Sequence, residues 1–191
     1  MTFDFAAART NMVESQVRTS DVTDYAIQDA MRAAPREELC PPEKRGLAYA
    51  DAEAPCGDGR WLMRPREIAK LLQAIRPRPG ERALAIAAPY GAAVLEIIGL
   101  TVDRLEEGDL SVPPRGRVYD VIVCEGAVAA VPAAWLGALA EGGRLGVVER
   151  TGPVGKARLY ARTDGSVGGR EVFDASTSIL PGFEVKAAFA F

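Results

Sequence analysis

Residues 119–124 read YDVIVC, and this short run decides the fold. β-branched and aromatic residues favour strands, so the run predicts a strong β-strand. In a second run, RALAIAA at 82–88, apolar residues do not alternate with polar ones, which is typical of a strand buried on both faces of a parallel sheet. Residues 144–149 (RLGVVE) predict a third strand. These runs therefore predict the centre of a parallel sheet.

The segments between these strands have the pattern of helices. Residues 91–100 and the region around 131–140 show helical spacing, a Gly-Gly turn follows at 142–143, and 102–110 is a weaker strand candidate. Strands that alternate with helices through short connections predict a doubly wound, mostly parallel α/β sheet.

The pattern changes after residue 155. Strands are predicted at 157–162, 169–173 and 183–191, and Asp-Gly, Gly-Gly and Pro-Gly pairs separate them. Such turn residues join antiparallel neighbours, so we expect the sheet to finish in an antiparallel C-terminal hairpin.

The chain begins with a helical and loop preface. Residues 5–20 predict a first amphipathic helix, and a second helix is expected to start after Asp21 or Thr23 and to end before Pro35. Residues 40–60 are rich in proline and glycine and predict an ordered surface loop without a regular element.

A further helix is predicted at 65–75, because its apolar residues fall on one face and Pro65 suits its first turn. No repeat or flexible linker interrupts the chain. We therefore expect residues 1–191 to form one domain, with residues 1–65 as the preface and 66–191 as a sheet core.

Composition excludes several classes of protein. Of 191 residues, 48% are hydrophobic and 26% are charged, which excludes a disordered or fibrous chain. The net charge is −3 and neither sign forms a long block, so no affinity for nucleic acid or for anionic membranes is expected.

The chain has no histidine, which removes the commonest general base and the commonest metal ligand. Cys40, Cys56 and Cys124 show no CxxC spacing, so we expect no zinc site and no disulfide, but three reduced thiols. The first residues lack the pattern of a signal peptide, and no apolar run has the ~20 residues of a membrane span. A cytoplasmic protein is expected.

Several short motifs occur in a family-specific order. They are residues 12–18 (MVESQVR), Asp24, 30–36 (AMRAAPR), 48–51 (AYAD), 55–60 (PCGDGR), 119–123 (YDVIV) and 139–145 (LAEGGRL). The chain thereby resembles the protein-L-isoaspartate O-methyltransferase family, within the class I S-adenosylmethionine-dependent methyltransferases. The resemblance implies a Rossmann-like methyltransferase sheet and methyl transfer to the carboxyl of isoaspartyl residues in damaged proteins.

The turn after the first strand departs from the family pattern. In the family, a glycine-rich turn lets the backbone approach the methionine part of the cofactor, because glycine has no Cβ. Here residues 87–91 read AAPYG, the turn is about two residues shorter in our alignment, and Pro89 has no amide hydrogen to donate. We expect a tight turn that no longer cradles the cofactor.

The middle of the chain is also short. A sheet of this type needs roughly 50 or more residues for the helices and strands between 88 and 119, and only residues 89–118 are present. One strand–helix unit is therefore expected to be missing. The resemblance implies that this unit carries the acidic residue that holds the ribose of the cofactor.

A third departure is Met63, which replaces a serine that approaches the substrate carboxylate in the family. A thioether cannot donate a hydrogen bond. Arg64 and Arg66 flank it and are either plain surface charges or a pair that binds an anion.

Other motifs favour ordinary structural roles. Residues 152–156 (GPVGK) lack the spacing of a phosphate-binding loop and predict a hairpin turn. Glu106, Glu107 and Asp109 are read as a solvated acidic face rather than a metal site. Glu125 is expected to follow its strand at the carboxyl edge of the sheet, where ligands bind in such folds.

Three hypotheses about function follow. The first is a methyltransferase-like protein without cofactor or catalysis that acts through protein contacts, and a homodimer is expected because a missing strand exposes a sheet edge. The second is an active enzyme that binds S-adenosylmethionine in a rearranged pocket around Tyr90, Gly91, Glu125 and Gly126. The third is a sensor of a small molecule or peptide in the same crevice.

Overall fold

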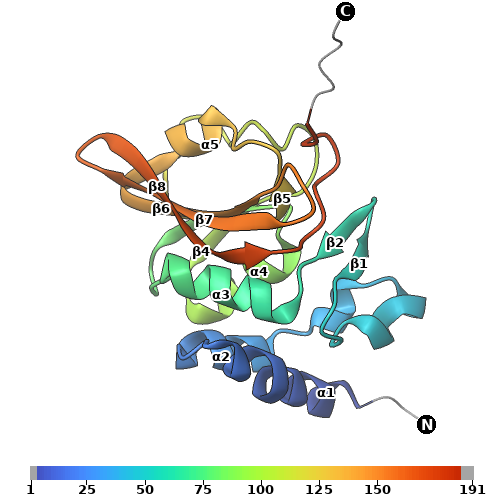
Figure 1. Cartoon of the computed structure of the whole chain (residues 1–191). Coiled ribbons are helices and arrows are strands. Elements are labelled where there is room, and N and C mark those ends of the chain that lie inside the picture. Colours follow the sequence, from blue (N-terminus) through green and yellow to red (C-terminus); the bar gives the residue numbers. More distant parts are fainter. Residues whose placement is uncertain (1–3, 186–191) are drawn as a thin grey trace, which may run out of the picture.

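The computed structural model describes residues 4–185, which contain a six-stranded sheet with the order β4-β3-β5-β6-β7-β8 (Figure 1). β4, β3, β5 and β6 run parallel, and β7 and β8 add antiparallel to β6. The bounds are β3 Arg82–Ile86, β4 Thr101–Leu105, β5 Tyr119–Val128, β6 Leu139–Glu149, β7 Gly155–Thr163 and β8 Ser166–Ala175. The predicted mostly parallel α/β sheet with an antiparallel finish is confirmed.

Helices cover both faces of this sheet. α3 (Pro65–Ile75) and α4 (Pro89–Ile98) pack on the face to which Ala83, Val121 and Val123 point. The short α5 (Ala133–Gly137) lies on the other face, where Trp135 packs with the alternate side chains of β3, β5 and β6. Because successive strand residues point to opposite faces, strands covered on both sides are apolar throughout.

The preface packs beneath α3 and α4 (Figure 1). α1 (Phe5–Met12) continues as a π-helix (Val13–Val17) and a 3-10 turn (Arg18–Ser20), so the predicted helix at 5–20 forms as one helical run. α2 (Tyr25–Ala33) follows. Its capping residue is Asp24, not Asp21 or Thr23, since the Asp24 carboxylate accepts from the amides of the first turn.

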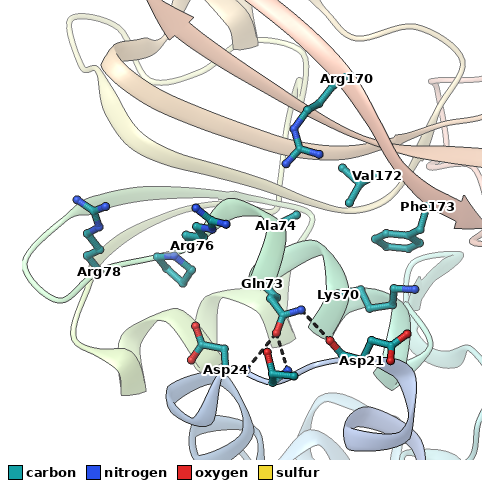
Figure 2. A pocket seen from close by; sticks show the side chains of 12 residues that line it. Asp21, Asp24, Lys70, Gln73, Ala74, Arg76, Arg78, Arg170, Val172 and Phe173 are labelled. Atoms are coloured by element: carbon teal, nitrogen blue, oxygen red, sulfur yellow. Dashed lines mark hydrogen bonds between the residues drawn. The ribbon is translucent and has the colours of Figure 1, made fainter.

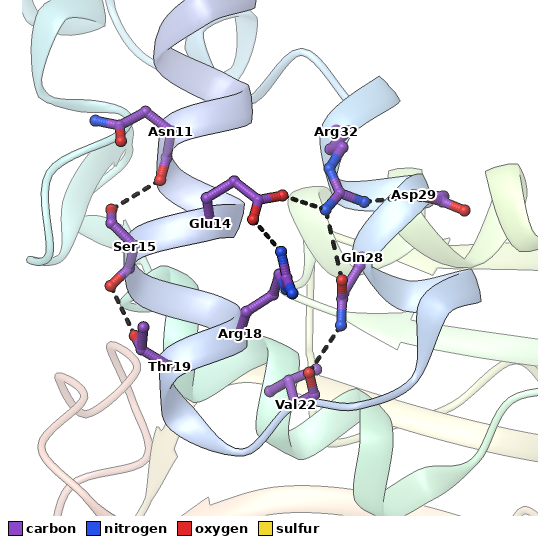
Figure 3. A network of polar contacts seen from close by, with 9 residues as sticks. All are labelled: Asn11, Glu14, Ser15, Arg18, Thr19, Val22, Gln28, Asp29 and Arg32. Carbon is purple, nitrogen blue, oxygen red and sulfur yellow. Dashed lines mark hydrogen bonds and ion pairs between the residues drawn. The ribbon is translucent and has the colours of Figure 1, made fainter.

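Charged groups tie the two preface helices together (Figure 3). The carboxylate of Glu14 binds the guanidinium groups of both Arg18 and Arg32. The buried Gln28 side chain donates to the carbonyl of Val22 at 2.9 Å and so fixes the turn between the helices.

Residues 36–62 are more regular than predicted. Two 3-10 helices (Arg36–Leu39 and Pro42–Leu47) precede a small antiparallel hairpin of β1 (Ala54–Gly57) and β2 (Arg60–Leu62). The expectation of a loop without regular elements at 40–60 is therefore wrong. The glycines that suggested a loop supply the hairpin turn, in which Gly57 and Gly59 have φ of 94° and 70°.

Several predicted boundaries differ from the structure, among them that of the strand predicted at 102–110, which ends at Leu105. β5 runs on to Val128, so Glu125 lies inside the strand and not after it. α5 spans only 133–137 because β6 already begins at Leu139, which pairs with Tyr119, and the Gly-Gly pair at 142–143 lies within β6. Of the strand predicted at 183–191, residues 186–191 lie outside the described residues and the rest is not in a strand.

The middle of the chain is short, as predicted. Between β4 and β5, residues 106–118 contain no helix or strand. The missing strand–helix unit is therefore the one after β4, while the strand next to β3 is present.

Cys40, Cys56 and Cys124 are free thiols. Within residues 4–185, no helix is long and apolar enough to cross a membrane.

Candidate active site

The turn between β3 and α4 is completely closed. Ala87 adopts a left-handed φ of 46°, which an alanine rarely takes, and Pro89 opens the helix. The side chains of Ala88, Pro89 and Tyr90 are all buried. The structure therefore confirms a tight turn in this position, and Tyr90 fills the crevice beside it.

The carboxylate of Glu125 caps α4. Its Oε2 accepts hydrogen bonds from the amides of Tyr90 and Gly91, both at 3.1 Å, and its Oε1 accepts from the amide of Met63 at 3.3 Å. The first amides of a helix lack partners within the helix and attract anions. Ala88, the residue before the helix, has no side chain that could serve, so a residue of the neighbouring strand fills this role.

Arg36 places its guanidinium against the same carboxylate. It comes from the 3-10 helix at 36–39, where its Nε donates to the Ala48 carbonyl at 2.7 Å and its Nη2 to the Met63 carbonyl at 2.5 Å. Its Nη1 lies 3.8 Å from Oε1 of Glu125, and the guanidinium stacks 4.7 Å from the ring centre of Tyr90. We call Arg36, Tyr90 and Glu125 the buried cluster.

Two polar atoms of this cluster have no hydrogen-bond partner within the described part of the chain. They are Nη1 of Arg36 and the hydroxyl of Tyr90, although both side chains of the Arg36–Glu125 pair are 0% exposed. Burial without a partner is costly in a protein interior. The buried cluster is thus closed to solvent, and two of its polar atoms lack a hydrogen bond.

Burial also shifts the acid–base behaviour of the cluster. The pKa of Glu125 is raised by loss of solvent, which outweighs the opposing effects of Arg36 and of the three amides. Burial raises the pKa of the Tyr90 phenol above its ordinary value as well. Both groups are buried from solvent in this arrangement.

Gly126 does not face a cavity. Its φ is 148°, and a Cβ at this position would lie 2.6 Å from the side chain of Leu180. Leu180 belongs to residues 176–183, which we call the strap. The strap crosses the end of β5, where Ala127 bonds to Ser178 and Leu180 through the backbone.

Glu53 holds the strap through hydrogen bonds. Its carboxylate accepts from the hydroxyls of Thr177 and Ser178 and from the Ser178 amide at 2.7–2.8 Å. Neither Glu53 nor Leu180 carried a signal in the sequence pattern, because contacts this distant along the chain are set by the fold. Gly126, proposed as a cofactor-binding residue, is covered by this strap.

The segment around Met63 has a structural role. Met63 is buried, and its backbone links Arg36 to Glu125. Arg66 pairs with Asp51 at 2.9 Å on the surface, whereas Nε of Arg64 is buried without a partner among residues 4–185. Both arginines line a cavity of about 290 Å³.

The acid at the end of β4 lies beside the turn. The amide of Ala87 donates to the carbonyl of Leu105 at 2.9 Å, and Glu106 follows directly. The side chain of Glu106 is 30% exposed and contacts Arg104 at 3.5 Å. The strand adjacent to β3 is thus present and is followed by a carboxylate, although a strand–helix unit after it is missing.

The two other motifs of the sequence lie in a hairpin turn and directly after β4. Residues 152–156 include the turn between β6 and β7 and the start of β7, as predicted for a hairpin. Glu106, Glu107 and Asp109 form no metal site, and within residues 4–185 no group of acids and cysteines could hold a metal ion.

Several cavities lie outside the buried cluster, and two of them differ in their lining. One, of about 680 Å³, has Arg76, Arg78 and Arg170 around one part and Asp21 and Asp24 around another (Figure 2). It lies near the start of β3, away from the turn at 87–91. The other, of about 520 Å³, lies beyond the end of β5 and is lined by residues such as Ser111, Ala129 and Phe183.

The mostly parallel sheet, with helices on both faces and two antiparallel strands at one end, matches the Rossmann-like methyltransferase fold of solved structures. Two solved structures share it. One, described as a protein-L-isoaspartate O-methyltransferase of Plasmodium falciparum in complex with S-adenosyl-L-homocysteine, has a TM-score of 0.74 and 14% identity over 90% of this chain and 97% of that one. A second protein-L-isoaspartate O-methyltransferase has a TM-score of 0.71 and 21% identity over 91% of this chain and 66% of that one.

The sequence comparison narrows the class to one family. A protein-L-isoaspartate O-methyltransferase of Methylorubrum populi is 34% identical over 183 residues, which cover 82% of this chain and 85% of the relative. That of Methylorubrum extorquens is 42% identical over 105 residues, but the match spans only 54% of this chain and 46% of the relative. No family model matches the chain. The chain belongs to the protein-L-isoaspartate O-methyltransferase family.

This membership corrects one expectation. The altered turn suggested that no cofactor is bound, but the relatives are named as methyltransferases and one solved structure of this fold holds S-adenosyl-L-homocysteine. The expectation of no cofactor is therefore wrong, and nothing in the comparisons indicates a loss of catalysis. They favour the second of the three hypotheses, an active enzyme.

The arrangement of the turn does not fit the whole cofactor, however. The amides of Tyr90 and Gly91 already bind Glu125, and the space beside them holds the Tyr90 ring and the Arg36 guanidinium. At the end of β4, by contrast, Glu106 is partly open to solvent. The turn at 87–91 is thus closed, and the acid that follows β4 is partly exposed.

Proposed function

We propose that this protein is a protein-L-isoaspartate O-methyltransferase, which transfers a methyl group from S-adenosylmethionine to the carboxyl of isoaspartyl residues. The observation that carries this proposal is the 34% identity over 183 residues with a relative of that name, which reaches from the preface into the sheet. Fold alone would not suffice, since one fold hosts many reactions.

In this proposal Glu106 binds the ribose hydroxyls of the donor. It stands at the end of β4, next to the turn at 87–91, where ligands bind in sheets of this kind. A carboxylate is a strong acceptor for hydroxyl donors. Its present partner, Arg104, is at the surface and also binds Glu96, so the Glu106 contact can be given up at little cost.

The enzyme assay compares two peptides of the same sequence, one with an isoaspartyl and one with an aspartyl residue. Purified protein is incubated with S-adenosylmethionine that carries a labelled methyl group. We expect label as a base-labile methyl ester on the isoaspartyl peptide alone. Equal labelling of both peptides would contradict the substrate, and no labelling at saturating donor would contradict the activity.

Glu106→Gln tests the role of Glu106. Hydrogen bonds to a charged group are worth roughly 1.5–3 kcal/mol each, so the loss of the charge should weaken binding of S-adenosyl-L-homocysteine by about tenfold or more. Glu107→Gln is the matched control, since Glu107 is the exposed neighbour. Isothermal titration of both variants measures the effect, and equal affinities would remove Glu106 from the site.

A further inference from the structure

Glu125 occupies the position in which this fold offers its best site for an anion. The N-terminal amides of the ten-residue α4 converge there, and both oxygens of Glu125 accept backbone amides. The carboxylate is part of the chain, so the site is filled without a ligand.

A second observation shows that Glu125 does not satisfy the site fully. Arg36 is 0% exposed, and its Nη1 has no hydrogen-bond acceptor among residues 4–185, since the carboxylate of Glu125 stays 3.8 Å away. A buried guanidinium N–H without an acceptor is costly, so an anion within hydrogen-bond distance of Nη1 would be bound favourably. The Tyr90 hydroxyl, equally buried, is a second unfilled group in the same place.

We propose that Glu125 is an internal stand-in for the carboxylate of an incoming ligand, so that a ligand with an amino-acid carboxylate must displace Glu125 from the amides of Tyr90 and Gly91. The ligand then caps α4 and binds Arg36. This proposal rests on the proposed function, because it concerns how the methyl donor and its product enter their site.

The strap covers β5 directly after Glu125. Leu180 packs against Gly126, the next residue of β5, and the strap bonds to β5 only from Ala127 onward. β5 also has an irregular register with β6 between Val123 and Ala127, so the backbone around Glu125 is less tied to its neighbour than the rest of the strand. A shift of this bulge would carry Glu125 away from α4.

The test is isothermal titration of S-adenosyl-L-homocysteine into the full chain and three variants. Glu125→Ala removes the competitor. Glu125→Gln keeps its size and one acceptor but binds amides more weakly, so this variant should keep the fold if the alanine variant does not. Glu67→Gln is the control, since Glu67 is also a buried carboxylate but accepts from Ser176, away from the turn.

Removal of an internal competitor raises the fraction of open sites, so we expect about tenfold tighter binding or more for Glu125→Ala. The glutamine variant should show a smaller gain, and the Glu67 control should match the wild type. Sodium acetate, compared with sodium chloride at equal ionic strength, should raise the melting temperature of Glu125→Ala by about 2–4 °C and leave the wild type unchanged.

Two results would overturn the proposal. If the wild type and both Glu125 variants bind with equal affinity, Glu125 does not compete, and the proposed function stands. If none of them binds, no ligand site lies beneath Glu125, and methyl transfer by the wild type then decides the proposed function separately.

Discussion

At the scale of single residues, the buried charges of Arg36 and Glu125 depend on each other. Both side chains are 0% exposed, and each would be an uncompensated buried charge without the other. Removal of one partner of a buried pair costs more than the pair itself contributes, because the remaining charge has lost both water and partner.

Arg36→Met should therefore destabilise the protein strongly. The expected loss is about 3–5 kcal/mol in the free energy of unfolding, measured by urea denaturation. Arg66→Met is the control, because the Arg66–Asp51 pair is at the surface and should be worth about 0–1 kcal/mol. Similar losses for both variants would contradict a buried pair.

Glu125 also makes stability depend on pH. Its pKa is raised in the folded state, so the folded chain holds the proton more tightly than the unfolded chain. The contribution of Glu125 to stability is thus greatest below the ordinary carboxyl pKa of 4.5 and is lost as pH rises through the raised folded value.

The wild type should therefore lose stability relative to Glu125→Gln as pH rises above about 4.5, the point where an unshifted glutamate ionises. Urea denaturation of both proteins across that range measures the difference. A difference that stays constant, or that grows in favour of the wild type with pH, would contradict the raised pKa.

Gly126 allows a close contact between β5 and the strap. Gly126→Ala should cost roughly 1–3 kcal/mol, because the new Cβ collides with Leu180 and the φ of 148° disfavours alanine. Gly137→Ala is the control, since no atom lies within 4 Å of a Cβ there. The second substitution should be neutral or stabilising by thermal denaturation, and equal losses would contradict the contact.

At the scale of elements, the middle of the strap is held by the carboxylate of Glu53, while Glu67 accepts from the Ser176 amide at its start. Glu53 accepts three hydrogen bonds from Thr177 and Ser178, so Glu53→Gln should lower protection of the Ser178 and Ala127 amides in hydrogen exchange. Glu43→Gln, on the exposed 3-10 helix, should leave both unchanged. If both amides keep their full protection in Glu53→Gln, the backbone hydrogen bonds alone hold the strap.

Elements with a strong local pattern could be predicted from the sequence. α3 was found because its apolar stripe and Pro65 agree, and the core of β5 because its residues are β-branched. The end of β5 was missed, since Glu125 and Gly126 break the apolar run. In the sequence, Arg36 stands out only as part of a family motif. Its contact with Glu125 could not be predicted, because the two residues lie far apart in sequence and only the fold brings them together.

At the scale of the whole molecule, the homodimer remains a proposal. The loss of one strand–helix unit leaves β4 at an edge of the sheet. Charged residues of this strand, Asp103 and Arg104, form ion pairs with Arg117 and Glu96, and charge on an edge opposes further strand pairing. Sedimentation at micromolar concentration should show a dimer if another surface provides the contact, and a monomer would end the proposal.

The most direct test of the account is a crystal structure of the chain with S-adenosyl-L-homocysteine bound. The ligand carboxylate should lie on the amides of Tyr90 and Gly91 within reach of Arg36, with Glu125 displaced and the ribose on Glu106. A ligand bound elsewhere, with Glu125 still on those amides, would contradict the account.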